Sequence, residues 1–203
     1  MAIKVTIQEL DVVAQQLQDG KIVAFPTDTV YGLACRSDSQ ELLERLRRVK
    51  GRPEEKPFPI VVGSIEQCED VAIVDQRALQ IMSQWWPGAL TLVLNKKSKV
   101  EDWATQGRST IAVRMLDEEG ISEMIKNVGV PLFLTSANRS SDPVCKTGDE
   151  VMGRLGERID VVVDGKHQDN LASTILDCTQ EKLSVLREGK ISLEEIEKSI
   201  RED

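Results

Sequence analysis

The chain has 203 residues, of which 40% are hydrophobic and 30% charged, and its formal net charge is −8. This length predicts a single domain, residues 1–203, with a core of its own. No apolar run approaches the ~20 residues of a membrane-spanning helix, so no membrane partner is expected. The acidic balance argues against a surface that binds nucleic acid regardless of sequence.

The cysteines indicate a reducing environment. Cys35, Cys68, Cys145 and Cys178 are widely spaced, and with the one histidine, His167, they give no zinc-site spacing. We therefore expect reduced cysteines that pack in the core of a cytoplasmic protein, and no metal site built from protein ligands. The N-terminus lacks the pattern of a signal peptide. His167 lies in a polar loop, 165–171, and receives no role.

The first helix is expected between Thr6 and Gly20, because Thr6 and Glu9 form a capping-box pattern and the apolar residues that follow have helical spacing. A strand at 21–25 should come next, and a second apolar run covers 30–34.

Between these two runs lies the turn Pro26-Thr27-Asp28-Thr29. Its two hydroxyls and its carboxylate would bind a small polar ligand at the end of a strand. They would equally serve the turn alone, because Asp and Thr side chains bond their own backbone. The sequence leaves both interpretations open.

A helix at 38–49 leads into a basic loop, Lys50 to Pro57, and then into a strand at 59–63. Glycine and two prolines prevent helix or strand from continuing through the loop. Lys50, Arg52 and Lys56 give it three cations within seven residues, which suits a polyanion. A solvated charged loop is the alternative.

The rest of the chain alternates between helices and strands. Helices are expected from Ser64, from Asp75 to Trp86, at 117–128, from Thr147 to Gly156 and from Ser192, and strands at 89–94, 110–115, 130–134, 160–164, 173–178 and 183–187. Because strands adjoin one another in two places, the pattern predicts an α/β fold with α+β character. We expect a twisted, open, mixed sheet flanked by helices.

Further site candidates lie in or after these strands. Arg114 has apolar neighbours, so it would need either an ion pair or an anion in a cleft, and both remain open. Ser136 and Asn138 follow a buried strand, where open α/β sheets place their ligands. With Arg187, the set is cationic and hydroxylic, without a Walker loop or a catalytic triad. Such a set favours chemistry by positioning and charge neutralisation on a nucleotide.

Short motifs along nearly the whole chain point to one family. They are Phe25 to Leu33, Lys50-Gly51-Arg52-Pro53, Lys56-Pro57, Trp86-Pro87-Gly88, Leu90-Thr91, Ala112-Val113-Arg114, Ser136-Ala137-Asn138, Ser173-Thr174 and Leu186 to Gly189. With them the chain resembles the YrdC-like family of L-threonylcarbamoyladenylate synthases, in the short form without a further C-terminal domain. The resemblance implies a YrdC-like fold around a large concave cleft.

The resemblance also implies an activity. ATP, bicarbonate and L-threonine would give threonylcarbamoyl-AMP and pyrophosphate, which is a nucleotidyltransferase reaction. The product would feed partner proteins that modify the adenosine beside the anticodon of certain tRNAs, and direct contact with tRNA is a weaker expectation. Mg²⁺ would accompany ATP, held by phosphate oxygens and water.

Roles follow by similarity. Lys50 and Arg52 would be catalytic, neutralising the triphosphate, and Thr27 and Arg114 would hold threonine, with Arg114 on its carboxylate. The expected ATP contacts are Lys50, Arg52, Lys56, Thr110, Ser136, Asn138 and Arg187. The chain departs from the family pattern at Val144, where some relatives carry a nucleotide-contacting serine, and at the bulky, stiff pair Phe58-Pro59.

Two other functions compete with this one. The same cleft would serve an RNA-binding module linked to ribosome maturation, whose affinity would fall steeply with salt. Similar domains also occur in carbamoyltransferases that use carbamoyl phosphate, which carry additional domains.

Overall fold

Ten strands of the described chain join in one sheet, in the order β1-β8-β2-β3-β7-β4-β6-β5-β9-β10. The computed structural model describes residues 1–52, 56–118, 120–165 and 172–200. The strands are β1 (Ile3–Thr6), β2 (Val23–Phe25), β3 (Gly32–Arg36), β4 (Ile60–Val62), β5 (Leu90–Asn95), β6 (Thr110–Met115), β7 (Leu132–Ser136), β8 (Val161–Asp164), β9 (Thr174–Asp177) and β10 (Ser184–Arg187). Parallel pairs such as β4–β6 and antiparallel pairs such as β5–β6 both occur, which confirms the expected mixed sheet.

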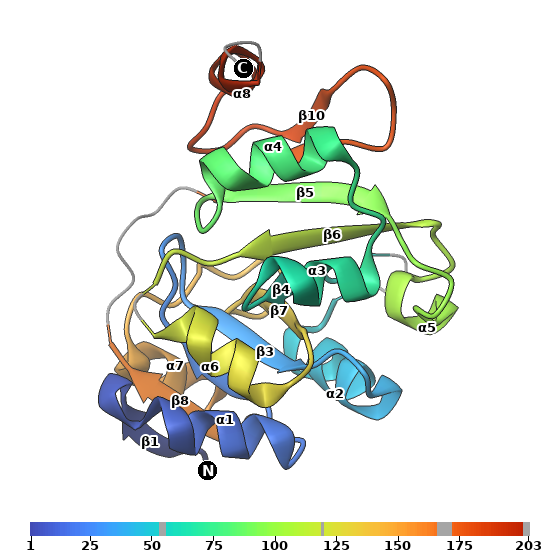
Figure 1. The fold of residues 1–203 in the computed structure, drawn as a ribbon. Coiled ribbons are helices and arrows are strands. Elements are labelled where there is room, and N and C mark those ends of the chain that lie inside the picture. The colour runs from blue at the N-terminus through green and yellow to red at the C-terminus, as the bar shows by residue number, and fades with distance from the viewer. Residues whose placement is uncertain (53–55, 119, 166–171, 201–203) are drawn as a thin grey trace.

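Helices cover both faces of this sheet (Figure 1). They are α1 (Leu10–Gln18), which follows the 3-10 turn η1 (Ile7–Glu9), α2 (Gln40–Lys50), α3 (Ile65–Val71), α4 (Gln76–Trp85), α5 (Asp102–Thr105), α6 (Ile121–Val128), α7 (Gly148–Leu155) and α8 (Leu193–Ser199). No helix in the described ranges is both long and apolar enough to cross a bilayer.

The core divides into two clusters, one on each face of the sheet. Helices α1 and α6 lie side by side over the half of the sheet that contains β2, β3 and β8 (Figure 1). Helices α2, α3, α4, α7 and α8 supply buried side chains to the cluster on the opposite face. The four cysteines are free and buried, as expected from the sequence.

The strand alternation shows where one face stays uncovered. In β5 and β6, Leu92 and Val113 are buried among the α4 side of the core, while their neighbours Val93 and Ala112 point to the other face. Neither α1 nor α6 extends over these strands in the described structure, and a cavity lies there instead. The fold thus leaves one half of a sheet face open as the floor of a cavity.

Most helix starts follow the sequence pattern. The side chains of Ser64, Asp75, Thr147 and Ser192 each accept a hydrogen bond from the backbone N–H three residues on. These bonds satisfy donors that a helix leaves unpaired, so the four predicted caps are confirmed.

Some element boundaries differ from the prediction. The residues 3–6 form strand β1, paired in parallel with β8, and the four-residue helix α5 also lacked a sequence signal. The helix expected at 117–128 begins only at Ile121, after Gly120, and the strand expected at 130–134 runs from Leu132 to Ser136. Residue 119 lies outside the described structure.

Helix α2 also differs at both ends. Its N-cap is Ser39, whose hydroxyl accepts from the Leu42 N–H, because Asp38 is engaged with Arg36 instead. At the other end the helix includes Lys50, which was expected in the basic loop, and terminates at Gly51 in the left-handed conformation. Residues 53–55 of that loop, and His167, fall outside the described residues.

Candidate functional site

The open sheet face forms the floor of a cavity of about 600 Å³. Its floor follows the two-residue period of the strands, with Thr91 and Val93 from β5 and Thr110, Ala112 and Arg114 from β6. Side chains of β4, β7, β9 and β10 extend the same surface. The cavity lining therefore draws on most of the chain, from Thr27 to Arg187.

Charge in the cavity is strongly one-sided. Arg52, Arg108, Arg114 and Arg187 line it, whereas Asp177 is the one carboxylate among the described lining residues. This local excess of positive charge contrasts with the net charge of −8 of the whole chain. Desolvation lowers the pKa of Arg52, Arg114 and Arg187, which indicates that these guanidinium groups lack full hydration. Such a surface attracts an anion.

Six of the nine predicted site residues line this cavity. They are Thr27, Arg52, Thr110, Arg114, Ser136 and Arg187. Lys50 and Asn138 are not among its described lining residues, but both contact Ser136, which is. Lys56 is exposed and reaches the site only through its carbonyl, which accepts from Arg52 Nε at 3.2 Å. Arg114 lies within strand β6 rather than at its end.

At one corner, Arg114 forms a buried ion pair. Its Nη2 donates to Asp28 Oδ2 at 2.6 Å, its Nη1 to Thr29 Oγ1 at 3.0 Å, and its Nε to the carbonyl of Gly88 at 2.8 Å. The side chains of Arg114 and Asp28 are only 7% and 10% exposed. Burial raises the pKa of the Asp28 carboxyl, and the positive charge of Arg114 opposes that rise. The ion-pair interpretation of Arg114 is thus observed, while the residue also faces the cavity.

The turn before β3 bonds to itself at the same corner. Thr27 Oγ1 donates to the carbonyl of Val30 at 2.6 Å and accepts from the N–H groups of Val30 and Thr29. The turn interpretation of these side chains is therefore observed. Thr27 and Thr29 nevertheless both line the cavity, so the turn forms part of its wall.

At a second corner, the ammonium group of Lys50 is buried among neutral oxygens. Lys50 Nζ donates to the carbonyl of Ser136 at 2.7 Å, to Ser136 Oγ at 2.9 Å and to Asn138 Oδ1. Burial, followed by the nearby charge of Arg52, lowers the pKa of Lys50 to about 8. The bonds tie the Lys-x-Arg and Ser-x-Asn motifs together, although 86 residues separate Lys50 from Ser136.

The third corner joins Arg187, an expected ATP contact, to Ser173 and Thr91, which received no role from the sequence. Arg187 Nη2 donates to the carbonyl of Ser173 at 2.7 Å and to Ser173 Oγ at 3.0 Å. The hydroxyl groups of Ser173 and Thr91 lie 2.8 Å apart. A hydroxyl in an otherwise apolar strand, as at Thr91, was the available sequence signal. Asp177, by contrast, gave no signal beyond its place at the end of a strand.

Apolar side chains complete the cavity. Val144 lines it and contributes methyl groups to its surface. Phe58 also lines it. A cavity of this size with apolar patches and a few convergent polar groups is typical for a small-molecule ligand.

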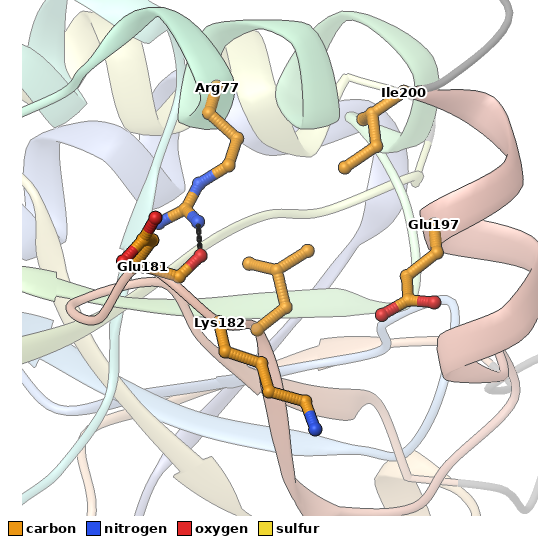
Figure 2. Close-up of a pocket in the computed structure, with 6 residues that line it drawn as sticks. Arg77, Glu181, Lys182, Glu197 and Ile200 are labelled. Atoms are coloured by element: carbon orange, nitrogen blue, oxygen red, sulfur yellow. Dashed lines mark hydrogen bonds between the residues drawn. The ribbon is translucent and has the colours of Figure 1, made fainter.

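A second cavity, of about 440 Å³, lies apart from this site (Figure 2). Its labelled residues are Arg77, Glu181, Lys182, Glu197 and Ile200, none of which was predicted for the site. Figure 2 shows Arg77 directed toward Glu181 in the β9–β10 connection, to whose carbonyl it donates. Arg77 also donates to the carbonyls of Gln180 and Cys178, at 2.7 Å and 3.0 Å. This arginine therefore holds a loop in place.

Comparisons with known proteins agree on one family. A family model for Sua5/YciO/YrdC proteins, described as telomere recombination, matches residues 15–189. The threonylcarbamoyl-AMP synthase of Pyrococcus abyssi is 36% identical over 196 residues, which are 96% of this chain and 58% of that relative. The enzyme of the same name from Vibrio vulnificus strain YJ016 is 33% identical over 187 residues, 90% of this chain and 100% of that relative.

A solved structure supports the same comparison. The crystal structure of P. abyssi Sua5 complexed with L-threonine matches with a TM-score of 0.91 and 34% identity, over 98% of this chain and 61% of that one. The chain thus spans little more than half the length of some relatives and the full length of others.

Proposed function

Because the chain belongs to the Sua5/YciO/YrdC family, we propose that it is a threonylcarbamoyl-AMP synthase that uses ATP, bicarbonate and L-threonine. The observation that carries the proposal is the cavity on the open sheet face, where four arginines and several hydroxyl groups converge. Its volume of about 600 Å³ suits small molecules. The complex of P. abyssi Sua5 with L-threonine supports the choice of amino acid.

The reaction proceeds in two steps. The amine of threonine attacks the carbon of bicarbonate, and loss of water leaves an N-carboxylate. An oxygen of this carboxylate then attacks the α-phosphorus of ATP, and the bond to the β-phosphate oxygen breaks, so that pyrophosphate leaves with its electron pair. The second step makes the protein a nucleotidyltransferase. It requires neutralised phosphate oxygens and an aligned nucleophile, both of which are positioning tasks.

The phosphates belong with Lys50 and Arg52. Arg52 lines the cavity, and Lys50 lies directly before the glycine that ends α2. With its amine held by Ser136 and Asn138, Lys50 also fixes the turn that contributes the Ser136 hydroxyl to the site. Thr110 and Arg187 would contact the rest of the nucleotide, and Lys56 would approach it from outside the cavity.

Threonine belongs with Thr27 and Arg114. An arginine has five N–H groups, of which Arg114 uses one each on Asp28, Thr29 and Gly88. The remaining donors can take the carboxylate of threonine, in a guanidinium already fixed by the protein. Fixing the group beforehand reduces the entropy that binding must remove.

Mg²⁺ would act as the charge partner of ATP. Among the described residues, no group of three or more histidine, cysteine or carboxylate side chains could hold a metal. Asp177 is the single carboxylate in the described cavity lining, and its Oδ1 already accepts from Thr179. These residues fit an Mg²⁺ ion that would be coordinated mainly by phosphate oxygens and water. The ion would offset the negative charge of the phosphates.

The product would pass to proteins that complete the modification of tRNA. A carbamoyl-adenylate is an activated acyl group, so its consumer must supply a nucleophilic amine. The four free, buried cysteines support a cytoplasmic location for these steps.

The proposal is tested by omitting substrates. The wild-type protein, given ATP, bicarbonate and threonine, should release pyrophosphate, and omission of any one of the three should stop the release. Lys50→Ala and Arg52→Ala should each abolish it while the protein stays folded by circular dichroism.

Lys99→Ala is the matched control, because it removes a cation from an exposed ion pair with Asp70. Turnover at the wild-type rate in the Lys50 and Arg52 variants would refute their roles. Threonine-independent release in the wild type would refute the proposed reaction.

A further inference from the structure

Phe58 brings two arginines together at one end of the cavity. The guanidinium carbon of Arg52 lies 4.7 Å from the centre of the Phe58 ring, and that of Arg47 lies 5.2 Å from it. Both distances fall within the range for attraction between a cation and the face of an aromatic ring. The ring itself is buried and lines the cavity.

Backbone carbonyls hold Arg52 in the same orientation. Its Nε donates to the carbonyl of Lys56 at 3.2 Å and its Nη2 to the carbonyl of Pro57 at 2.9 Å. Arg47 Nη1 donates to the carbonyl of Lys56 as well, at 3.4 Å. Among the described residues, no carboxylate forms an ion pair with Arg52, and the partners that the described residues offer its guanidinium are neutral carbonyl groups.

Such an arrangement has an electrostatic cost. Two like charges repel, and burial together with the charge of Arg47 lowers the pKa of Arg52. The negative face of the ring and the carbonyl dipoles offset the repulsion, and neither carries a full negative charge that would neutralise Arg52. The bonds of Arg52 to the described residues use two of its five N–H groups. The guanidinium therefore keeps its full charge and its donors for an anion in the cavity.

Phe58 also has an aromatic support of its own. The ring of Phe133 lies 6.5 Å from that of Phe58, and Trp103 packs edge-on against Phe133 at 6.3 Å. Phe58 thus contacts the core through Phe133 and also contacts the two guanidinium groups. A leucine would fill similar space but would present no negative face.

We propose that Phe58 is a positioning residue that aims Arg52 at the polyphosphate of the ligand. The inference deepens the proposed function and rests on it for the identity of that ligand as a nucleoside triphosphate.

Binding of inorganic tripolyphosphate, measured by isothermal titration calorimetry, tests the proposal without turnover. Phe58→Leu should weaken binding about threefold to tenfold, the loss expected from one cation–ring contact. Phe58→Tyr keeps a ring face and should stay within about twofold of the wild type. If Phe58→Leu does not fold, Phe58→Met replaces it, because methionine adapts to irregular core space.

Phe133→Leu is the matched control, because it makes the same change in the same aromatic cluster, at a ring that contacts no cation among the described residues. It should lower the melting temperature as Phe58→Leu does, and leave tripolyphosphate binding unchanged. In an Arg52→Met background, Phe58→Leu should add less than about a twofold loss, because no cation at position 52 is left for the ring to hold.

Equal weakening in Phe133→Leu would overturn the inference, since general packing would then explain it. Wild-type affinity in Phe58→Leu, or a loss in Phe58→Tyr as large as in Phe58→Leu, would do so too. Threonine-dependent pyrophosphate release in the same proteins is read separately. An inactive wild type that still binds tripolyphosphate through Phe58 would refute the synthase but not the positioning role.

Discussion

Two buried cations of the site are stabilised in opposite ways. Arg114 has a carboxylate partner in Asp28, whereas Lys50 has three neutral oxygens from Ser136 and Asn138. A buried pair that loses one member leaves an uncompensated charge, while a buried amine among neutral groups can release its proton. The two residues should therefore respond differently to substitution and to pH.

Removal of Arg114 should affect both stability and threonine binding. Arg114→Met should lower the free energy of unfolding by about 3–5 kcal/mol, because Asp28 is left buried and unpaired. The double variant Asp28→Asn/Arg114→Met should recover most of this loss in urea unfolding. It should still raise the KM for threonine at least about tenfold, while the KM for ATP stays within about twofold. Equal increases in both constants would contradict the assignment of Arg114 to the carboxylate.

Lys50 should make stability depend on pH. The Lys50 ammonium has its ordinary pKa of 10.5 in the unfolded chain, and its pKa in the folded protein is about 8. Between these values the unfolded state binds more protons, so stability rises with pH. The unfolding free energy of the wild type relative to Lys50→Met should increase by up to about 1.4 kcal/mol per pH unit in this window. Urea titrations from pH 7 to 10 that run parallel for both proteins would contradict the lowered pKa.

The sequence identified these residues more readily than their partners. Arg114 was recognised as an arginine needing a counter-charge because its neighbours are apolar. The partner Asp28 lies 86 positions away, across strands whose pairing no local pattern reveals. Likewise, Lys50 and Ser136 stood out as parts of motifs, but their direct contact depends on where α2 and β7 meet.

At the scale of elements, the end of helix α2 determines why Lys50 and Arg52 point in different directions. Gly51 adopts a φ of 59°, which stops the helix between Lys50 and Arg52. Lys50 then stays with the helix and points to Ser136, whereas Arg52 turns to the carbonyls of the following loop. Among the described residues, a Cβ at position 51 would come within 4 Å of Arg139 alone, at 3.9 Å, whereas the left-handed backbone conformation favours glycine there.

Alanine at this position should therefore cost stability through the backbone alone. Gly51→Ala should lower the free energy of unfolding by about 1 kcal/mol, measured by thermal denaturation. Gly153→Ala is the matched control, because Gly153 lies inside α7 with nothing within 4 Å of an added Cβ. It should raise stability by about 0.5–1 kcal/mol. Equal effects at both glycines would show that the left-handed turn is not what residue 51 supplies.

Helices and strands whose ends are marked by capping residues, glycine or proline could be predicted from the sequence. Those that depend on tertiary contacts could not. Four serine, threonine or aspartate caps began helices where expected, and β6 has the predicted bounds Thr110–Met115. Strand β1 and helix α5 have four residues each, too few to show a period. β1 exists because β8 offers it an edge with which to pair.

At the scale of the whole molecule, an acidic protein holds a cationic cavity. The chain carries a net charge of −8, yet four arginines and one aspartate are the charged side chains among the described residues of the cavity lining. Long-range repulsion should keep an extended polyanion away, whereas a small one can enter the arginine-lined space. This charge distribution favours a nucleotide over a duplex as ligand.

The salt dependence of RNA affinity distinguishes the proposed synthase from an RNA-binding module. A 30-base-pair RNA duplex should not bind measurably at about 150 mM salt, and it should not compete with ATP for the cavity. Fluorescence anisotropy of a labelled duplex gives the measurement, with the slope of affinity against salt as the diagnostic. Tight binding with a steep slope, displaced by ATP, would instead favour the RNA-binding module.

The uncovered half of the sheet separates the residues that line the cavity from those that pack in the core. Along β5, β6 and β9, each cavity residue sits next in sequence to one that packs beneath it, as Val93 does beside Leu92, and Ala112 beside Val113. Exchanges at the outward positions reshape the ligand's surroundings without disturbing the buried layer. Libraries of substitutions at Val93, Ala112 and Ile175 should therefore change the substrate specificity of the protein while its melting temperature stays close to that of the wild type.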